Sequence, residues 1–354
     1  MKILLLSPLP PPAGGIASWT KRYLESGQAK LHEVYVVNTA VIGSRVNQFN
    51  KRNITDEIVR TIRIFITLKN ELKLNKPQMV HLNTACSNLG LIRDYLCGKM
   101  VKKCGAKLVL HCRCDVAYMV KSKNAKRYYR KLVNLSDEII TLNSSSWQYT
   151  LTNCGRESMI LPNFLPESTL NVIKSRDKIQ LRFNNCLYVG HVMEAKGCDL
   201  ILRIAKRIPQ ITFTMVGFVS EEIKILDKPD NVVFTGEVSK EKVLQHMMKA
   251  DLFLFPSLSE GFPNVVMEAM ACGLPIVATG VGAIPDMIED KGGIFVEVGD
   301  VNGFVTAIKK LQGNCELCDQ MSNWNRSKVE SRYSQQKVMD ALFKMYGELL
   351  GDLR

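Results

Sequence analysis

The chain has 354 residues, which is too long for one ordinary hydrophobic core and fits two domains of about 150–180 residues. A hydrophobic content of 46% and a mean hydropathy of −0.02 predict a soluble globular protein, and no apolar run approaches the length of about 18 residues that a transmembrane helix needs. The opening MKILLLSPLPPP has too short an apolar run for a signal peptide. We therefore expect a cytoplasmic protein.

The positive charge is unevenly distributed along the chain. Residues 1–160 hold 25 Lys and Arg against 10 Asp and Glu, a net charge of +15, whereas the remainder holds 22 against 24, a net charge of −2. All of the excess charge of +13 therefore belongs to the first half. This asymmetry predicts an anionic surface or an anionic partner for that half.

Eleven cysteines are scattered along a chain with no export signal, and their number is odd. Reduced thiols are the interpretation that this pattern favours. The close pairs Cys112-x-Cys114 and Cys315-x2-Cys318 leave a zinc site as the alternative. Neither has a second cysteine pair or a convincing histidine partner, so we expect no metal there.

The first half alternates buried strands with amphipathic helices. Gly14 and Gly15 lie between the first strand and a helix that starts near Ile16; a ligand could approach the backbone there, or the turn could simply require glycine. Apolar residues recur at helical spacing over 55–74, with basic residues on the polar face. We expect strands over 2–7, 33–38, 77–83, 107–111, 138–142 and 158–161, and helices over 55–74 and 91–104.

Lysines, arginines and tyrosines alternate between Tyr118 and Lys131. A basic helix that carries tyrosines suits an anionic membrane surface. Two alternatives are nucleic-acid binding, which no recognised motif supports, and a solvated face without a partner. We expect peripheral contact with the inner face of the cell membrane and no nucleic acid.

The polar run over 171–182 reads as a linker, after which the strand–helix alternation starts again. Alternation of this kind predicts parallel sheets covered on both faces. We therefore expect an α/β protein of two Rossmann-like doubly wound domains that face each other across a cleft. The expected domains are 1–170 and 171–330, and residues 331–354 form a C-terminal helix that packs back on the first domain.

The stretch from Asp251 to Thr279 predicts a buried strand, a polar loop, a helix from Asn264 and a second strand. Pro263 and Gly273 are typical start and stop signals for this helix. Glu268 is the one carboxylate on an otherwise apolar helix, where burial is costly without hydrogen-bond donors or a cation. Its simplest interpretation is a partly exposed residue on a helix edge; the alternative is a ligand-binding carboxylate beside an anion-binding helix N-terminus.

Three elements of the second half resemble a known family when they are read in order: GHVMEAKG at 190–197, FTGEV at 234–238, and EGFPNVVMEAMACGLPIVAT at 260–279, with PNF at 162–164 before them. They are similar to the motifs of the retaining glycosyltransferases of family 4 (glycosyl transferases group 1), which have the GT-B fold. The resemblance covers the second domain almost end to end and the first domain more loosely.

The resemblance implies roles for individual residues. Glu260 corresponds to the glutamate near the transferred sugar, and Glu268 to the one that accepts hydrogen bonds from the ribose diol. His111 would face the sugar and the acceptor, so His111 and Glu260 are the expected catalytic residues. The expected donor-binding residues are Gly15, His191, Lys196, Gly261, Phe262, Pro263, Asn264, Val265 and Glu268.

The same resemblance implies no metal and no cofactor other than the nucleotide-diphospho-sugar donor. The chain has no D-x-D motif, and Lys196 with a helix end would stabilise the leaving diphosphate. His191 departs from the pattern, because the family most often has arginine five residues before the lysine. A neutral imidazole donates only one hydrogen bond, whereas guanidinium offers a bidentate fork.

The sequence thus predicts a retaining, metal-independent glycosyltransferase. The donor would be a UDP-sugar rather than a GDP-sugar, and the acceptor a glycan or a lipid-linked acceptor in cell-surface polysaccharide biosynthesis. One alternative is a nucleotide-sugar 2-epimerase, which shares the GT-B architecture. Another is a basic binding protein of this fold that has lost catalysis.

Overall fold

The computed structural model describes residues 1–12, 14–43, 54–174 and 183–351 and divides the chain into two compact units. Unit 1 comprises Met1–Asn163 and Gln335–Arg354, and unit 2 comprises Phe164–Ser334. The α/β fold class is confirmed, because each unit is built on a six-stranded sheet whose strand pairs are parallel.

Unit 1 has the strand order β2-β1-β3-β4-β5-β6. Its strands are β1 (Lys2–Ser7), β2 (Glu33–Asn38), β3 (Met79–Thr84), β4 (Lys107–Cys112), β5 (Glu138–Thr141) and β6 (Met159–Ile160). Its helices are α1 (Gly15–Glu25), α2 (Gly27–Lys30), α3 (Ile54–Leu74), α4 (Asn88–Lys103), α5 (Val116–Met119), α6 (Lys123–Leu135), α7 (Ser144–Cys154) and α16 (Gln335–Leu350).

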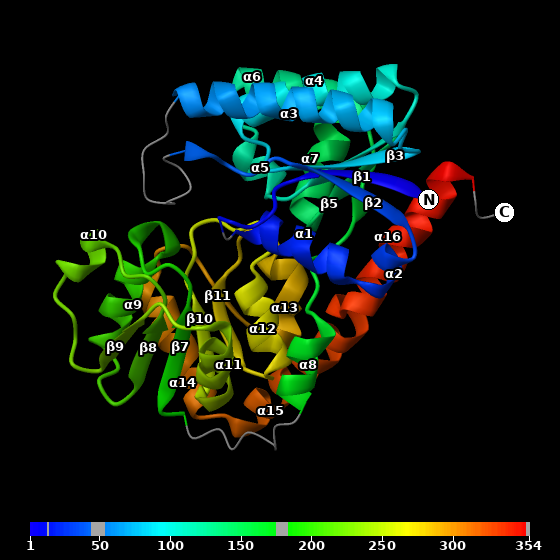
Figure 1. Cartoon of the computed structure of the whole chain (residues 1–354). Coiled ribbons are helices and arrows are strands. Elements are labelled where there is room, and N and C mark those ends of the chain that lie inside the picture. The colour runs from blue at the N-terminus through cyan, green and yellow to red at the C-terminus, as the bar shows by residue number, and fades with distance from the viewer. Residues whose placement is uncertain (13, 44–53, 175–182, 352–354) are drawn as a thin grey trace. The chain divides into compact units, whose positions relative to one another are not determined.

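Helices α3, α4 and α6 lie side by side on one face of this sheet, and α1, α2 and α16 lie on the other (Figure 1). The central strands β1, β3 and β4 are buried on both faces, and β1 is accordingly an almost continuous apolar run. β3 and β4 also carry buried polar residues towards their carboxyl ends, among them His81, Asn83 and His111. Polar side chains at the carboxyl ends of these strands therefore collect at one edge of the sheet, where ligands of doubly wound folds bind.

Unit 2 has the strand order β12-β11-β10-β7-β8-β9. Its strands are β7 (Asn185–Val189), β8 (Thr212–Val216), β9 (Val232–Gly236), β10 (Leu252–Phe255), β11 (Ile276–Thr279) and β12 (Gly293–Val296). Its helical segments are α8 (Glu167–Lys174), η2 (Glu194–Lys196), α9 (Cys198–Ala205), α10 (Glu221–Lys224), α11 (Lys240–Lys249), α12 (Asn264–Ala271), α13 (Ile284–Gly292), α14 (Val301–Gln312), α15 (Cys315–Lys328) and η3 (Val329–Tyr333).

The structural boundaries differ from the expected ones after residues 170 and 330. The backbone N–H of Leu165 donates to the carbonyl of Tyr333 at 2.9 Å, and Leu165 forms a parallel bridge with Ser334. These contacts hold the segments around 165 and 333 together inside unit 2. The expected linker begins inside α8, and residues 175–182 lie outside the described residues.

Candidate functional site

The loop between β10 and α12 holds the start of the motif EGFPNVVMEAMACGLPIVAT in unit 2. Pro263 caps α12 without a side-chain hydrogen bond, and the first turn of the helix holds no acidic residue. The positive end of the helix dipole is therefore not offset by a local carboxylate in that turn. Phe262 and Pro263 are buried, whereas Gly261, Asn264 and Val265 are partly exposed.

Glu260 and Lys196 are brought together although 64 residues separate them. Lys196 Nζ lies 2.7 Å from Glu260 Oε1, and Ser257 Oγ donates to the same oxygen at 2.8 Å. The Glu260 side chain is only 12% exposed and that of Lys196 34%. A cation and a carboxylate thus lie side by side, one suited to phosphate oxygens and the other to sugar hydroxyls.

Two glycines allow this close approach. Gly197, which follows Lys196, has φ +70°, and a Cβ there would lie 2.1 Å from the carbonyl oxygen of Pro256. Gly282 has φ +58°, and a Cβ there would lie 1.7 Å from the carbonyl oxygen of Glu260. Both positions therefore require glycine for steric as well as conformational reasons. The backbone around the Lys196–Glu260 pair is consequently fixed by packing from two sides.

Glu268 lies in the interior of α12 and is 7% exposed. The simplest sequence interpretation, a partly exposed residue on a helix edge, is therefore wrong. The reason is that α12 is enclosed on several sides, with contacts to α11, α13, α15 and η3. A buried carboxylate in such a helix needs polar partners to offset its desolvation. Its predicted role toward a ribose diol remains a prediction.

His191 lies in the exposed loop after β7. Its carbonyl accepts a hydrogen bond of 2.9 Å from Tyr188 Oη, and its ring lies edge-on to Phe218 with a centroid distance of 6.5 Å. An exposed ring can turn toward a ligand, so the position suits the predicted donor contact. Its chemistry in place of arginine remains a prediction.

In unit 1, Gly15 begins α1 and Gly14 is its N-cap, with no side-chain cap. A Cβ built on either glycine would meet no atom within 4 Å, so their backbone borders open space. This leaves the start of α1 sterically open to a ligand. The predicted contact of Gly15 with the donor remains a prediction.

His111 occupies the carboxyl end of β4, as expected, but its ring is fully buried. Its Nδ1 lies 3.1 Å from His81 Nε2, and its Nε2 lies 2.9 Å from Arg113 Nη1. Burial lowers the pKa of His111 well below its usual range, and the Arg113 charge adds to this effect. Both ring nitrogens are thus engaged inside unit 1, and the imidazole is neutral.

Sequence reasoning gave no role to Arg113, Asn163, Ser257 or Tyr346. Arg113 Nη2 donates to Asn163 Oδ1 at 2.6 Å, and Tyr346 Oη of α16 is hydrogen-bonded to His81 Nδ1. A local pattern could have found Arg113 and Ser257, because each follows the carboxyl end of a central strand, where ligands of doubly wound folds bind. No local signal could have paired Tyr346 with His81, because 265 residues separate them.

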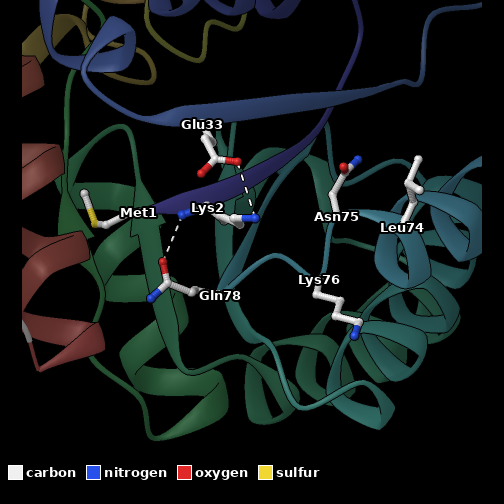
Figure 2. Close-up of a pocket in the computed structure, with 7 residues that line it drawn as sticks. All are labelled: Met1, Lys2, Glu33, Leu74, Asn75, Lys76 and Gln78. Atoms are coloured by element: carbon white, nitrogen blue, oxygen red, sulfur yellow. Dashed lines mark hydrogen bonds and ion pairs between the residues drawn. The ribbon is translucent and has the colours of Figure 1, made fainter.

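Figure 2 shows a different hollow of about 620 Å³ at the amino ends of β1, β2 and β3. Lys2 Nζ lies 3.4 Å from Glu33 Oε2 there, and the Lys2 backbone N–H donates to Gln78 Oε1 at 2.9 Å. These groups satisfy one another at the sheet edge opposite to the strand carboxyl ends. This hollow is therefore not a candidate for the predicted chemistry.

Within the described residues, no group of three or more His, Cys, Asp or Glu is placed to hold a metal ion. The eleven cysteines are all free thiols. None of the helices in the described ranges is long and apolar enough to cross a bilayer.

Comparison with known protein families finds a match that lies inside unit 2. Residues 184–314 match the family model of the glycosyl transferases group 1. The chain is 26% identical over 261 residues to an uncharacterised 41.2 kDa protein in the cps region of Klebsiella pneumoniae; the match covers 68% of this chain and 71% of that protein. It is also 30% identical over 175 residues to the capsular polysaccharide biosynthesis glycosyltransferase CapM of Staphylococcus aureus, covering 46% of each.

Among solved structures, Anabaena Alr3699/HepE in complex with UDP superposes with a TM-score of 0.76 over 98% of this chain and 100% of that one, at 16% identity. At this identity the likeness establishes the fold alone, which is that of the GT-B glycosyltransferases. The domain match and these relatives together support a place for the chain in the glycosyltransferase superfamily. Several curated relatives are matched over less than two thirds of their length.

Proposed function

We propose that the chain is a retaining glycosyltransferase of family 4 that moves a sugar from a nucleotide-diphospho-sugar to a glycan or a lipid-linked acceptor. The observation that carries this proposal is the Lys196–Glu260 pair, held at 2.7 Å beside the N-terminus of α12 within the region that matches the group 1 family. The relative CapM, which is named for capsular polysaccharide biosynthesis, supports a role in cell-surface polysaccharide assembly.

Each group at the site suits one part of a sugar nucleotide. Lys196 and the N–H groups at the start of α12 offer a charge and donors to the diphosphate. Glu268 offers an acceptor for the ribose diol, and Glu260 offers one for the sugar hydroxyls. A UDP-sugar is the favoured donor, in keeping with the UDP bound by the structurally similar Alr3699/HepE.

The proposed reaction is a same-face substitution at the anomeric carbon. The bond from this carbon to the diphosphate oxygen breaks as the bond to the acceptor oxygen forms, and the acceptor hydroxyl gives its proton to the leaving phosphate. Lys196 and the α12 dipole stabilise the charge that develops on the diphosphate, so no divalent metal is needed. Full loss of activity in EDTA with recovery in manganese would contradict metal independence, and an inverted product anomer would contradict retention.

Unit 1 carries a surface suited to a membrane. Ile54, Ile58, Ile62 and Ile66 recur every four residues along one side of α3, and each is at least 52% exposed. Exposed basic residues lie on the same helix and on α6, which packs against α4 on the same face of the sheet: Arg63, Lys69, Lys73, Lys123, Lys126, Arg127 and Arg130. Apolar side chains flanked by cations are typical of surfaces that bind anionic lipid. We therefore propose peripheral contact with the inner face of the cell membrane, where a lipid-linked acceptor would reside.

The test is a panel of UDP-sugars and GDP-sugars with polyprenyl-phosphate-linked glycan acceptors, read as nucleotide release and as glycosylated product. One donor is expected to give product at a rate well above its hydrolysis. Conversion of a UDP-sugar into its C2 epimer without transfer would instead show a nucleotide-sugar 2-epimerase. Binding without any turnover across the panel would show a non-catalytic protein.

A further inference from the structure

The carboxyl end of β4 in unit 1 holds a buried guanidinium that has no acidic partner within the described residues. We propose that Arg113 is the group of unit 1 that binds a phosphate of the substrate, and that His111, His81 and Tyr346 are positioning residues that hold Arg113 in place. This inference rests on the proposed function, because a sugar nucleotide and a lipid-linked acceptor both carry phosphate.

The direction of every hydrogen bond in this cluster follows from one fact, that arginine only donates. Arg113 Nη1 donates to His111 Nε2, so Nε2 carries no proton and the proton of the neutral ring lies on Nδ1. His111 Nδ1–H then donates to His81 Nε2, and His81 Nδ1–H donates to Tyr346 Oη. Both histidines are thereby fixed in the Nδ1-protonated tautomer.

This order of bonds reassigns the role of His111. Its Nε2 lone pair is used by Arg113 and its Nδ1 proton by His81, so neither nitrogen can accept or donate a proton to a substrate in this arrangement. Arg113 lies at the end of the row and still has unused N–H groups. The substrate-contacting role that sequence reasoning gave to His111 therefore passes to Arg113.

The charge of Arg113 is buried and unbalanced. The residue is 9% exposed, its Nε has no hydrogen-bond partner, and burial lowers its pKa to about 9, which still leaves it charged at neutral pH. Arg93 of the same unit is balanced by a carboxylate, because its Nη2 lies 2.7 Å from Asp94 Oδ1. A desolvated guanidinium with a free N–H and no carboxylate is costly unless an anion binds it.

Trp19 connects this cation to the start of α1. The Arg113 guanidinium lies over the Trp19 ring at 4.6 Å from its centroid, and the Trp19 ring also stacks on His81. Helical side chains lean toward the helix N-terminus, so Trp19 extends from the second turn of α1 back toward Gly15. The open N-terminus of α1, with its positive dipole end, and the guanidinium both favour an anionic ligand.

The experiment compares Arg113→Gln and Arg113→Lys with wild type and with the control Arg156→Gln. Arg156 is a partly exposed arginine of the same unit that donates to the carbonyls of Ser136 and Asp137. Affinity for inorganic pyrophosphate and for UDP is measured by calorimetry, and the KM is measured for acceptors with and without a phosphate. Loss of a charged hydrogen bond predicts about a 10–100-fold effect in Arg113→Gln, a smaller one in Arg113→Lys and none in the control.

The two measurements distinguish a phosphate of the donor from a phosphate of the acceptor. Weaker UDP and pyrophosphate binding shows that Arg113 holds the donor diphosphate. A higher KM confined to the phosphorylated acceptor shows that it holds the acceptor phosphate. Unchanged values in both arms overturn the proposal. If no sugar is transferred but pyrophosphate binding still depends on Arg113, the proposed function fails and this inference stands.

A second measurement remains valid if Arg113→Gln does not fold. Two-dimensional ¹⁵N imidazole spectra of the wild-type protein should show His111 and His81 as neutral Nδ1–H tautomers, and both signals should shift when pyrophosphate is added. Tyr346→Phe removes the hydrogen bond to His81 and should shift the same signals while reducing pyrophosphate affinity about 3–10-fold, the effect of one neutral hydrogen bond. An Nε2–H tautomer at His111, or imidazole signals that do not shift when pyrophosphate is added, would overturn the proposal.

Discussion

The polar clusters of the two units differ in how the chain assembles them. In unit 2, Ser257 and Glu260 come from one continuous stretch, which also holds Glu268, and Lys196 joins them from 64 residues away. In unit 1, His81, Arg113 and Tyr346 come from β3, from the residue after β4, and from α16 near the end of the chain. A contiguous site leaves a motif in the sequence, whereas a site assembled from distant segments leaves only isolated polar residues.

The clusters also differ in charge. The Lys196 cation of unit 2 is paired with Glu260 and is one third exposed, whereas the Arg113 cation of unit 1 is buried with no carboxylate among the described residues. A paired, partly exposed ion can exchange its partner for a ligand at little cost. A buried unpaired ion is costly in the free protein and gains more from a bound anion. We therefore expect substitutions in unit 2 to act mainly on turnover and those in unit 1 to act on stability as well.

The largest effect is expected for Lys196→Ala. Removal of a preorganised cation at the leaving diphosphate should lower kcat about 100–1000-fold, measured as nucleotide release from the best donor. The control is Lys206→Ala, because Lys206 also forms a 2.7 Å ion pair in unit 2, with Asp227, but is exposed. Equal rates of nucleotide release for the two variants would show that Lys196 has no part in catalysis.

Acid should destabilise unit 1 through its buried histidines. Burial lowers the pKa of His81 from 6.5 to about 3 and that of His111 well below 6.5, so the unfolded chain binds more protons as the pH falls below 6.5. Folding stability should therefore drop by about 2 kcal/mol for each such histidine between pH 7.5 and pH 5, measured by urea unfolding. His81→Gln should halve this loss. The control His246→Gln should leave the loss unchanged, because His246 is a partly exposed residue of α11 in unit 2. A stability that is flat across this window would contradict the neutral histidine pair.

The smallest effect is expected at the isoleucine row of α3. Replacement of Ile58 and Ile62 by serine should weaken sedimentation with anionic vesicles about 10-fold, because less apolar surface enters the lipid interface. Ile225→Ser is the control, since Ile225 is 82% exposed but belongs to unit 2. If the wild-type protein does not sediment with such vesicles at low salt, the proposed membrane contact is wrong.

Much of the fold was predictable because its signals are local. The strand expected over 2–7 is β1, the buried strand expected after Asp251 is β10, and the helix expected from Asn264 is α12. No individual element is predicted over 280–326, although Asp300 and Asn314 each cap a helix there with their side chains. The unit boundaries differ from the expected ones because they follow from contacts between distant segments, such as that between Leu165 and Tyr333, which no local pattern reports.

The candidate site was predictable to a different extent in each unit. Lys196 and Glu260 were named from sequence and do meet in the structure. His111 was also named, but its neighbour Arg113 was not, because only the fold reveals that both imidazole nitrogens are used and that the guanidinium lacks a carboxylate. Which group donates each hydrogen bond depends on residues that only the folded chain brings together. It therefore cannot be read from the order of residues in the sequence.

The most direct test of the central claim is the binding of UDP and GDP to wild type, Glu268→Gln and Glu221→Gln. Glu221 is an exposed glutamate of unit 2 that pairs with Lys224, and it serves as the matched control. The account predicts that one nucleotide binds to wild type and to Glu221→Gln equally well, and about 10–100-fold more weakly to Glu268→Gln, the loss of a charged hydrogen bond. Equal affinity in all three proteins, or no nucleotide binding by wild type, would contradict it.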